Sequence, residues 1–320
     1  MPIAKTSMGL PSVVELANLY VLDSMKGFGP QKFKLLYQAH IPAADVIRDP
    51  KLLPVPGKLG DPIRAQLKKV SSKLIDECAK RAEKQLKVAE TTKSQILTFS
   101  HPLYPSRVFN SNNPIGILYV RGNVTVLQSQ KTIACVGSRN IREPYSRLHA
   151  SFAHTASEQD VTVVSGFALG ADTIGHKAAI ENKGHTICVM PSGLDRPFPP
   201  ENKDLWQTFL FNDRAVFVSE FPFGTGAASL NLRKRNKLIV AFAQGVLVSQ
   251  SSATGGAMNA YRFALEQRKP VSTFLDDGTE DTSGNKAIAA DSKSRGVTFP
   301  SSHTDELAYQ QWLRTLLSST

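Results

Sequence analysis

The sequence predicts an α/β fold in which helices cover both faces of a parallel sheet, preceded by a small all-helical domain. From Lys131 to Thr273, short β-rich apolar runs alternate with helical stretches, which is the pattern of βαβ units. Residues 1–93 show amphipathic helical spacing without a convincing strand. With 320 residues, 41% of them hydrophobic, the chain is large enough for two domains with ordinary cores.

The helical domain is expected over residues 1–93 and carries most of the positive charge. Its 16 Lys and Arg against 9 Asp and Glu leave +7 of the net +11, which favours a polyanionic partner such as nucleic acid. Its helices are predicted at Val13–Met25, Pro30–Gln38, Ala43–Ile47 and Ile63–Val88.

The first two helices are joined by Gly27-Phe28-Gly29-Pro30, which resembles a helix-hairpin-helix element. Glycines let a backbone approach a phosphate, and the next helix offers free N–H groups to it. A secondary DNA contact is therefore expected at Lys26, Gly27, Gly29 and Lys32, with a helix-packing turn as the alternative. Pro56–Gly60 is a weaker candidate for a second hairpin.

The second domain is expected over residues 94–320 and starts with a bridging extension at 94–130. Prolines in the extension argue against helix, and Ile117–Val120 suits a short strand. The polar segment Asp276–Ser294 is expected to be a mobile loop, and a C-terminal winged-helix domain is not expected. The strands of the sheet are predicted at Ile133–Val136, Val161–Val164, Thr186–Val189, Ala215–Val218, Val246–Val248 and Val271–Phe274.

Ligands of parallel sheets bind at the carboxyl ends of the strands, so the corners that follow the strands are the candidate site. These corners supply small residues, hydroxyls and N–H groups, and a basic run that opens the helix before the fifth strand adds cations that suit phosphate. For Arg139 the alternative is an ion pair with a neighbouring carboxylate. The candidate phosphate-binding residues are Gly137, Ser138, Arg139, Ser165, Gly166, Phe167, Gly170, Arg233, Arg235, Asn236, Lys237, Gly255 and Gly256.

Two further side-chain roles stay open at these corners. Phe167 and Phe221 suit either stacking against bases or the core. Asp172 and His176 are four residues apart on a predicted helix and suit an acid/base pair, although helix capping by Asp172 and packing by His176 are favoured.

The sequence lacks the motifs that are typical of several classes of function. Walker A, Gly-x-Gly-x-x-Gly and Gly-x-Ser-x-Gly strings are missing, which argues against P-loop hydrolysis, dinucleotide cofactors and serine hydrolysis. The three cysteines and seven histidines lack ligand spacing, so neither a metal nor another cofactor is expected. Met1–Lys5 lacks the apolar start of a signal peptide, and no run reaches the ~18–20 apolar residues of a membrane span, so a cytoplasmic location is expected.

Ordered motifs along nearly the whole chain are similar to those of the DNA-processing protein A family, also called Smf, a bacterial recombination mediator in natural transformation. The shared motifs are Tyr104-Pro105, Leu118-Tyr119-Val120-Arg121-Gly122, Val136-Gly137-Ser138-Arg139, Val164-Ser165-Gly166-x-Ala168-x-Gly170-x-Asp172 with His176, Gly193-Leu194-Asp195 with Pro199-x-x-Asn202, Ser219-Glu220-x-Pro222-x-Gly224, Arg233-x-Arg235-Asn236, and Gly255 with Ala264-x-Glu266.

The resemblance implies an extended Rossmann-like domain after a helix-hairpin-helix/SAM-like one, and a basic pocket that binds single-stranded DNA. It also implies a homodimer without enzymatic activity that protects incoming DNA and loads a RecA-type recombinase. Departures at Leu169, Met190–Ser192 and Thr254–Ala257 indicate a divergent member.

Three alternatives remain beside this interpretation. A nucleotide N-glycosidase of the related lysine-decarboxylase-like fold needs a glutamate where this chain has Arg262, and Glu266 lies one helical turn later. A sensor would bind a small nucleotide in the same pocket without turning it over. A scaffold for duplex DNA would act mainly through the hairpin at Gly27–Pro30.

Overall fold

The computed structural model describes residues 9–318, and its contacts divide the chain into two compact units, Met1–Val120 and Arg121–Thr320. The predicted domain boundary at 93/94 follows directly on the last long helix of the first unit, and the extension at 94–130 contributes to both units. The segment Met1–Lys5, on which the absence of a signal peptide was argued, lies outside the described residues.

The first unit is mainly helical, as predicted. Its elements are α1 (Val13–Asp23), α2 (Pro30–Gln38), α3 (Ala43–Arg48), η1 (Pro50–Leu52), α4 (Gly57–Leu67), α5 (Ser72–Thr91), β1 (Ser94–Thr98), α6 (Ser106–Asn110) and β2 (Ile117–Gly122), whose last two residues belong to the second unit. The helix expected at Ile63–Val88 is two helices, because Ser71 caps α5 by accepting a hydrogen bond from the Leu74 amide. Strand β1 was not predicted.

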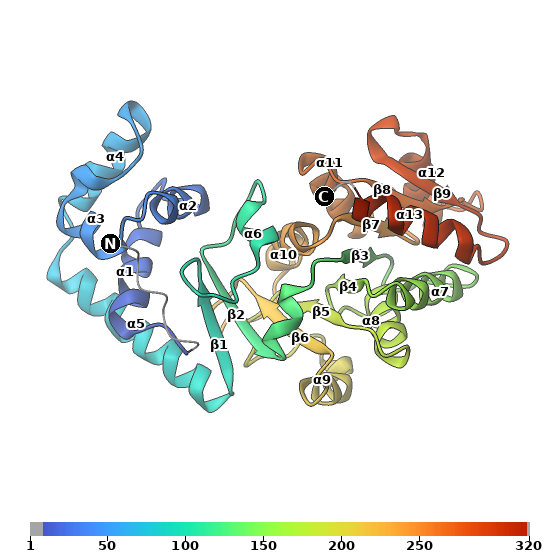
Figure 1. Cartoon of the computed structure of the whole chain (residues 1–320), viewed down its shortest axis with the longest axis horizontal. Helices are drawn as coiled ribbons and strands as arrows, with labels where there is room; N and C mark the ends of the chain where they lie inside the picture. The colour runs from blue at the N-terminus through green and yellow to red at the C-terminus, as the bar shows by residue number, and fades with distance from the viewer. Residues whose placement is uncertain (1–8, 319–320) are drawn as a thin grey trace. The chain divides into compact units, whose positions relative to one another are not determined.

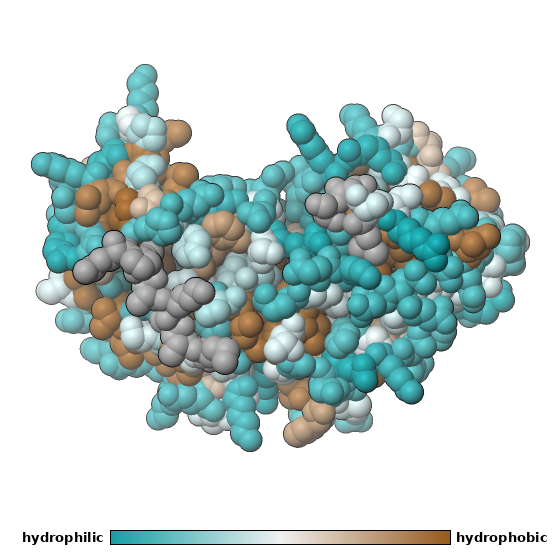
Figure 2. Space-filling model, in the orientation of Figure 1, coloured by the Kyte–Doolittle hydropathy of each residue, from teal (hydrophilic) through white to brown (hydrophobic). Residues whose placement is uncertain are grey.

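The core of the first unit forms where α1 packs on α5. Leu16, Leu22 and Ala82 are fully buried there, and the hydroxyls of Tyr20 and Tyr119 lie 2.8 Å apart in a buried hydrogen bond. Figure 2 shows hydrophobic side chains, in brown, scattered among hydrophilic ones on the surface. In α5 the buried residues Cys78, Ala82, Leu86 and Ala89 recur at helical spacing, whereas the charged residues of this helix are exposed.

The second unit is built on parallel strands in the order β6-β5-β4-β3-β7-β8-β9. The strands are β3 (Thr132–Val136), β4 (Thr162–Ser165), β5 (Thr186–Val189), β6 (Ala215–Ser219), β7 (Gly245–Val248), β8 (Val271–Phe274) and β9 (Arg295–Phe299). The predicted parallel-sheet fold class and its six strands are confirmed, and β9 is an additional strand.

Helices cover both faces of this sheet, since α7 and α8 pack on each other and on β3 and β4, while α10 and α11 pack on each other from the opposite face (Figure 1). The helices of the second unit are η2 (Val124–Gln128), α7 (Tyr145–Glu158), α8 (Ala171–Glu181), η3 (Pro200–Asn202), α9 (Lys203–Leu210), α10 (Ser229–Phe242), α11 (Ala257–Glu266), η4 (Glu280–Thr282), α12 (Ser283–Ala290), η5 (Ser292–Ser294) and α13 (Glu306–Ser318). Helix α13 packs on α7, burying Trp312 and Leu313.

The segment Asp276–Ser294, expected to be a loop, contains helix α12. The side chain of Ile288 is 1% exposed, and the buried Asn285 amide donates hydrogen bonds to the carbonyls of Ser249 and Phe274. These tertiary contacts stabilise α12, a helix that could not be predicted from its polar sequence. Within residues 9–318, no helix combines the length and apolar character needed to cross a bilayer.

Candidate functional site

A cavity of about 520 Å³ lies at the point where the strand order reverses, between β3 and β7. In parallel β3 and β7, Val136 pairs with Val248, so the corners that follow both strands lie side by side. This is the topological switch point at which open parallel sheets bind ligands. The predicted residues that line the cavity are Gly137, Ser138, Arg139, Arg233, Arg235, Asn236, Gly255 and Gly256.

Two helices begin at this cavity. Ser229 opens α10 and Ala257 opens α11, and neither helix has a side-chain hydrogen bond at its N-cap, Ala228 or Gly256. The first N–H groups of α10 lack intrahelical partners, and the helix dipole favours negative charge there. In α11, the amides of Met258 and Asn259 already donate to the carbonyls of Gly255 and Gly256. The backbone of the cavity is therefore suited to an anion.

Arg139 and Arg233 supply the exposed positive charge of the cavity. Arg139 follows β3, and Arg233 lies in the second turn of α10. Both side chains are exposed, and neither forms an ion pair with a carboxylate anywhere in residues 9–318. The alternative of an ion-paired Arg139 therefore finds no support, and both guanidinium groups are available to phosphates.

Arg235 lines the cavity but is only 5% exposed and is engaged within the protein. Its Nη1 donates to the Val189 carbonyl at 3.0 Å and lies 3.8 Å from Asp172 Oδ2. Burial lowers the pKa of Arg235 and raises that of Asp172, whereas the opposite charge of each partner counters the shift. The predicted phosphate ligand is, in this structure, half of a buried ion pair beneath the cavity.

Asp172 and Arg235 hold the corner that follows β4. Asp172 Oδ2 accepts the amides of Gly166 and Ala168, each at 3.2 Å. A Cβ on Gly166 would lie 1.2 Å from Arg235 Nη1, and one on Gly170 would lie 2.3 Å from the Arg139 carbonyl oxygen. These two glycines are needed for close packing, and neither lines the cavity.

Three other predicted residues lie outside the cavity. Ser165 is fully buried and donates its hydroxyl to the Cys135 carbonyl. Phe167 is 1% exposed among Trp206, Phe209 and Phe217, so it presents no face to a base. Lys237 is partly buried, with its ammonium 5.2 Å from the Phe263 ring centroid.

Phe221, the other aromatic for which two roles were open, is also buried, with a 7% exposed side chain. The neighbouring Lys234 lies over its ring at 5.4 Å and is neutralised by Glu220 at 2.9 Å. Among the described residues that line the cavity, none is aromatic. Base stacking therefore needs residues outside this cavity.

Asp172 and His176, for which an acid/base pair was one possibility, contact other residues instead. His176 Nδ1 lies 2.6 Å from Thr186 Oγ1, and a neighbouring histidine, His149, has its Nδ1 2.5 Å from Ser249 Oγ. Burial, the largest cause, lowers the pKa of His176 to about 3 and of His149 to about 4. Both imidazoles are neutral at pH 7 and pack behind the cavity.

The hairpin of the first unit has the expected geometry. Gly27 adopts a φ of +86°, a conformation that favours glycine, and Pro30 opens α2 after the N-cap Gly29. Lys26 is exposed and Lys32 partly so, while the Lys26 backbone exchanges hydrogen bonds with the Gln66 side chain. In the weaker candidate, Gly57 opens α4. DNA contact at either place stays a prediction.

Sequence reasoning missed one acidic member of the cavity, Asp281. Asp281 lies in η4, which follows β8, and no sequence motif in that segment indicates a binding residue. Arg142 tethers this segment through Asp277, at 2.6 Å, and Asp281, at 3.7 Å. Asp172, for which other roles were expected, also lines the cavity, and the remaining lining residues are Val136, Ala168, Ser229, Leu232, Ile239, Ser251, Ser252, Ala257 and Asn259.

A doubly wound parallel sheet whose switch point holds exposed arginines and the uncapped start of α10 defines a Rossmann-like protein with a cavity suited to anionic ligands. The chain belongs to the DNA recombination-mediator protein A family, whose sequence profile matches residues 95–301. The predicted family membership is therefore confirmed.

Bacterial relatives are consistent with this membership. Protein Smf of Escherichia coli K12 is 31% identical over 192 residues, covering 60% of this chain and 51% of that protein. DNA processing protein DprA of Streptococcus pneumoniae R6 is 31% identical over 176 residues, covering 55% of this chain and 60% of its own length. The chain thus spans only about half to three fifths of these relatives.

Two solved structures are similar in fold. The X-ray structure of DprA from Streptococcus pneumoniae superposes with a TM-score of 0.69 at 19% identity, covering 93% of this chain and 97% of that one. DNA processing protein A from Helicobacter pylori, described with its single-stranded DNA binding mode, gives 0.59 at 22% identity and covers 71% and 97%. The fold predicted from the resemblance is confirmed.

Gly166→Ala should destabilise the second unit, because the new methyl group would occupy the place of the Arg235 guanidinium and break its pairing with Asp172. We expect the free energy of unfolding to fall by about 3 kcal/mol or more. Both tryptophans, Trp206 and Trp312, lie in this unit, so urea unfolding followed by tryptophan fluorescence measures the change.

The matched control is Gly256→Ala, where an added Cβ meets nothing within 4 Å and the backbone is already helical. This variant should unfold at close to the wild-type urea concentration. Equal stability of the two variants would show that the close packing at Gly166 is relaxed in solution.

The second unit should lose stability as the pH falls from 7 to 4. Unfolded histidines titrate near pH ~6.5, whereas burial holds the pKa of His149 at about 4 and of His176 at about 3. Between these values the unfolded chain binds protons that the folded chain does not. Each histidine therefore contributes about 1.4 kcal/mol per pH unit near pH 5, stabilising above pH ~6.5.

Urea unfolding at several pH values measures this slope, again through tryptophan fluorescence. His149→Gln should reduce the slope by the contribution of one histidine, while substitution of the exposed His154 should leave it unchanged. An unaltered slope in His149→Gln would mean that His149 is not shielded from protons in the folded protein.

Proposed function

We propose that the chain binds single-stranded DNA in the cavity at the β3/β7 switch point. The observation that carries the proposal is that two exposed, unpaired arginines, Arg139 and Arg233, reach one cavity from separate elements. The uncapped start of α10 adds N–H donors for phosphate oxygens. Family membership and the single-strand binding described for the Helicobacter pylori protein support the same ligand.

The ligand contacts proposed here are mainly to the DNA backbone. Arginines and N–H groups recognise phosphates without reading sequence. Asn236 and Asn259, with Ser252, supply further hydrogen-bonding groups on the cavity wall. Because the aromatic candidates Phe167 and Phe221 are buried, we propose that affinity depends on charge and falls steeply with salt.

The proposed role is that of a recombination mediator rather than an enzyme. The glycosidase alternative places Arg262 where the glutamate is needed, and the Arg262 guanidinium donates to Asn259. Of the two carboxylates in the cavity, Asp172 is ion-paired and buried, and Asp281 is held near Arg142. Because each carboxylate is engaged with an arginine, the two do not resemble a catalytic acid/base pair.

We also propose that the chain acts as a homodimer that protects incoming DNA and loads a RecA-type recombinase during DNA uptake. This part rests on the family's description as a recombination mediator. Sedimentation of the purified protein tests the dimer. Recombinase assembly on DNA coated with single-strand-binding protein tests the loading, and a failure to accelerate that assembly would remove this part of the proposal.

Fluorescence anisotropy of a labelled oligo-dT across a salt series tests the DNA ligand. Arg139→Ala and Arg233→Ala should each weaken binding and reduce the slope of log affinity against log salt by about 0.7, the value for one phosphate contact on a single strand. Asp281→Asn should strengthen binding, because it removes a negative charge from the cavity.

Arg314→Ala is the matched control, since Arg314 is exposed on α13 outside the cavity and should leave affinity unchanged. AMP and duplex DNA serve as competitors, and neither should displace the strand efficiently. Complete displacement by AMP would favour the nucleotide sensor, and preference for duplex DNA would favour the hairpin scaffold.

A further inference from the structure

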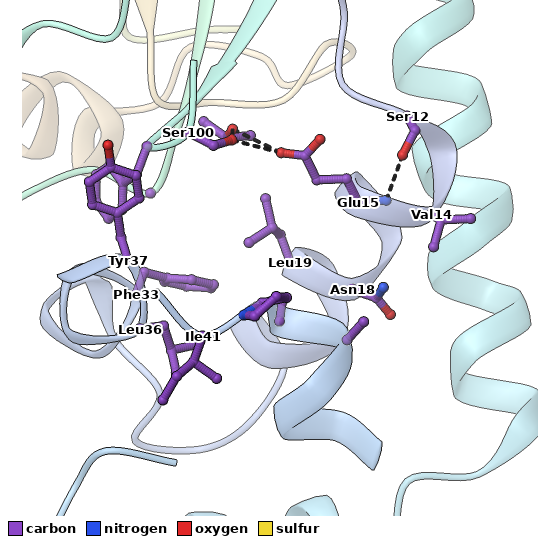
Figure 3. Close-up of a pocket in the computed structure, with 16 residues that line it drawn as sticks. Ser12, Val14, Glu15, Asn18, Leu19, Phe33, Leu36, Tyr37, Ile41 and Ser100 are labelled. Carbon is purple, nitrogen blue, oxygen red and sulfur yellow. Dashed lines mark hydrogen bonds between the residues drawn. The ribbon is translucent and has the colours of Figure 1, made fainter. Parts of the chain in front are cut away.

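The first unit contains a second cavity, unrelated to the DNA site, between α1, α2, α3 and the end of β1 (Figure 3). Its volume is about 320 Å³, within the range of roughly 300–1,000 Å³ typical of small-molecule sites. Its apolar wall is formed mainly by Val14, Leu19, Phe33, Leu36, Tyr37 and Ile41, with Phe99.

Aromatic rings form one side of this cavity. Phe33 and Phe99 are 7% and 8% exposed, whereas Tyr37 is 37% exposed and lies edge-on to Phe99 with ring centroids 6.2 Å apart. The faces of aromatic rings attract cations, and more strongly where water is excluded. The aromatic side of the cavity therefore suits a ligand with a positive charge.

Glu15 places a carboxylate in this apolar wall. Figure 3 shows its side chain directed toward Ser100, with Phe33 and Tyr37 across the cavity. Its Oε1 accepts hydrogen bonds from Ser100 Oγ at 3.0 Å and Thr98 Oγ1 at 3.1 Å. Both donors are uncharged, so the hydrogen bonds orient the carboxylate without neutralising it.

No cation compensates this carboxylate within residues 9–318. Neither a lysine nor an arginine forms an ion pair with Glu15 there. The nearby His101 is buried, and burial lowers its pKa although the charge of Glu15 opposes the shift. Among the described residues, the negative charge of Glu15 therefore has no cationic partner beside the apolar cavity.

We propose that this cavity binds a small organic ammonium ion, a molecule with an apolar body about the size of one aromatic ring and a single protonated amine. The body fills the space against Leu19, Leu36 and Ile41. The ammonium group donates to the Glu15 carboxylate within reach of the aromatic rings. Carboxylate and aromatic faces together are the groups that recognise ammonium ions in proteins.

The same chemistry excludes other ligand classes. An anion would be repelled by Glu15, and a neutral apolar molecule would desolvate the carboxylate without supplying an opposite charge. Glu15 also has a structural role, because it lies in the first turn of α1 and its hydrogen bonds join α1 to the end of β1. A purely structural role would not discriminate between ligands by charge.

Isothermal titration calorimetry of the whole chain at pH 7 with three ligands of similar shape tests the proposal. Phenethylamine is the cation, 2-phenylethanol the neutral analogue and 3-phenylpropanoate the anion. We expect phenethylamine to bind at least about tenfold more tightly than 2-phenylethanol, and the anion to bind least. Equal binding of the three, or no binding of phenethylamine at millimolar concentration, would overturn the proposal.

Glu15→Gln keeps the shape of the side chain and its hydrogen-bond acceptor but removes the charge. It should weaken phenethylamine about tenfold to a hundredfold and leave 2-phenylethanol unchanged. Asp61→Asn is the matched control, because Asp61 is an exposed carboxylate of the same unit that pairs with Arg64 outside the cavity. Unchanged amine binding in Glu15→Gln would refute the role of the carboxylate.

Ala44→Phe provides a test that does not depend on the folding of Glu15→Gln. Ala44 lines the cavity and is exposed, so a larger side chain there should block entry without disturbing the core. Loss of phenethylamine binding, with an unchanged circular dichroism melt, would support this location. Retained binding would place the amine elsewhere and overturn the proposal.

Discussion

The second unit depends on a buried ion pair between Asp172 on α8 and Arg235 on α10. Each charge is costly to remove from water, and each is tolerable only because the other is present. The pair also satisfies backbone groups, since Arg235 donates to the Val189 carbonyl and Asp172 accepts the amides of Gly166 and Ala168. One interaction therefore joins the corners after β4 and β5 to helices on both faces of the sheet.

Because of this ion pair, the basic residues of α10 differ in role: Arg235 stabilises the structure, whereas Arg233 is free to contact a ligand. Arg233 and Arg235 are two residues apart, and on a helix that spacing turns their side chains through about 200°, onto nearly opposite sides. Arg233 is consequently exposed at the cavity, while Arg235 lies beneath it. Lys234 pairs with Glu220 and Lys237 lies over Phe263. The positive charge that the cavity offers to an anionic ligand is therefore concentrated on Arg233 and Arg139.

Much of the fold was predictable because its strands are short, apolar and buried on both faces, as β3 and β6 illustrate. The exceptions are β1 and β9. In β9 the exposed Arg295 and the half-buried, polar Thr298 hide the pairing with β8. Helix α12 escaped prediction for a similar reason. Its polar sequence becomes helical because Asn285 and Ile288 are buried against the sheet, and such contacts leave no periodic signal in a short segment.

The sequence by itself determined the family, the parallel sheet and the corners at which a ligand should bind, because these depend on local runs of apolar and small residues. The tertiary structure alone decided which candidates face the cavity. It exposes Arg139, buries Arg235 and Phe167, and brings Asp281 to the cavity from η4, which is distant in sequence. It also assembled the cavity around Glu15 from helices and a strand far apart in the chain. Burial and charge pairing are set by residues remote in sequence, so no local pattern could have revealed them.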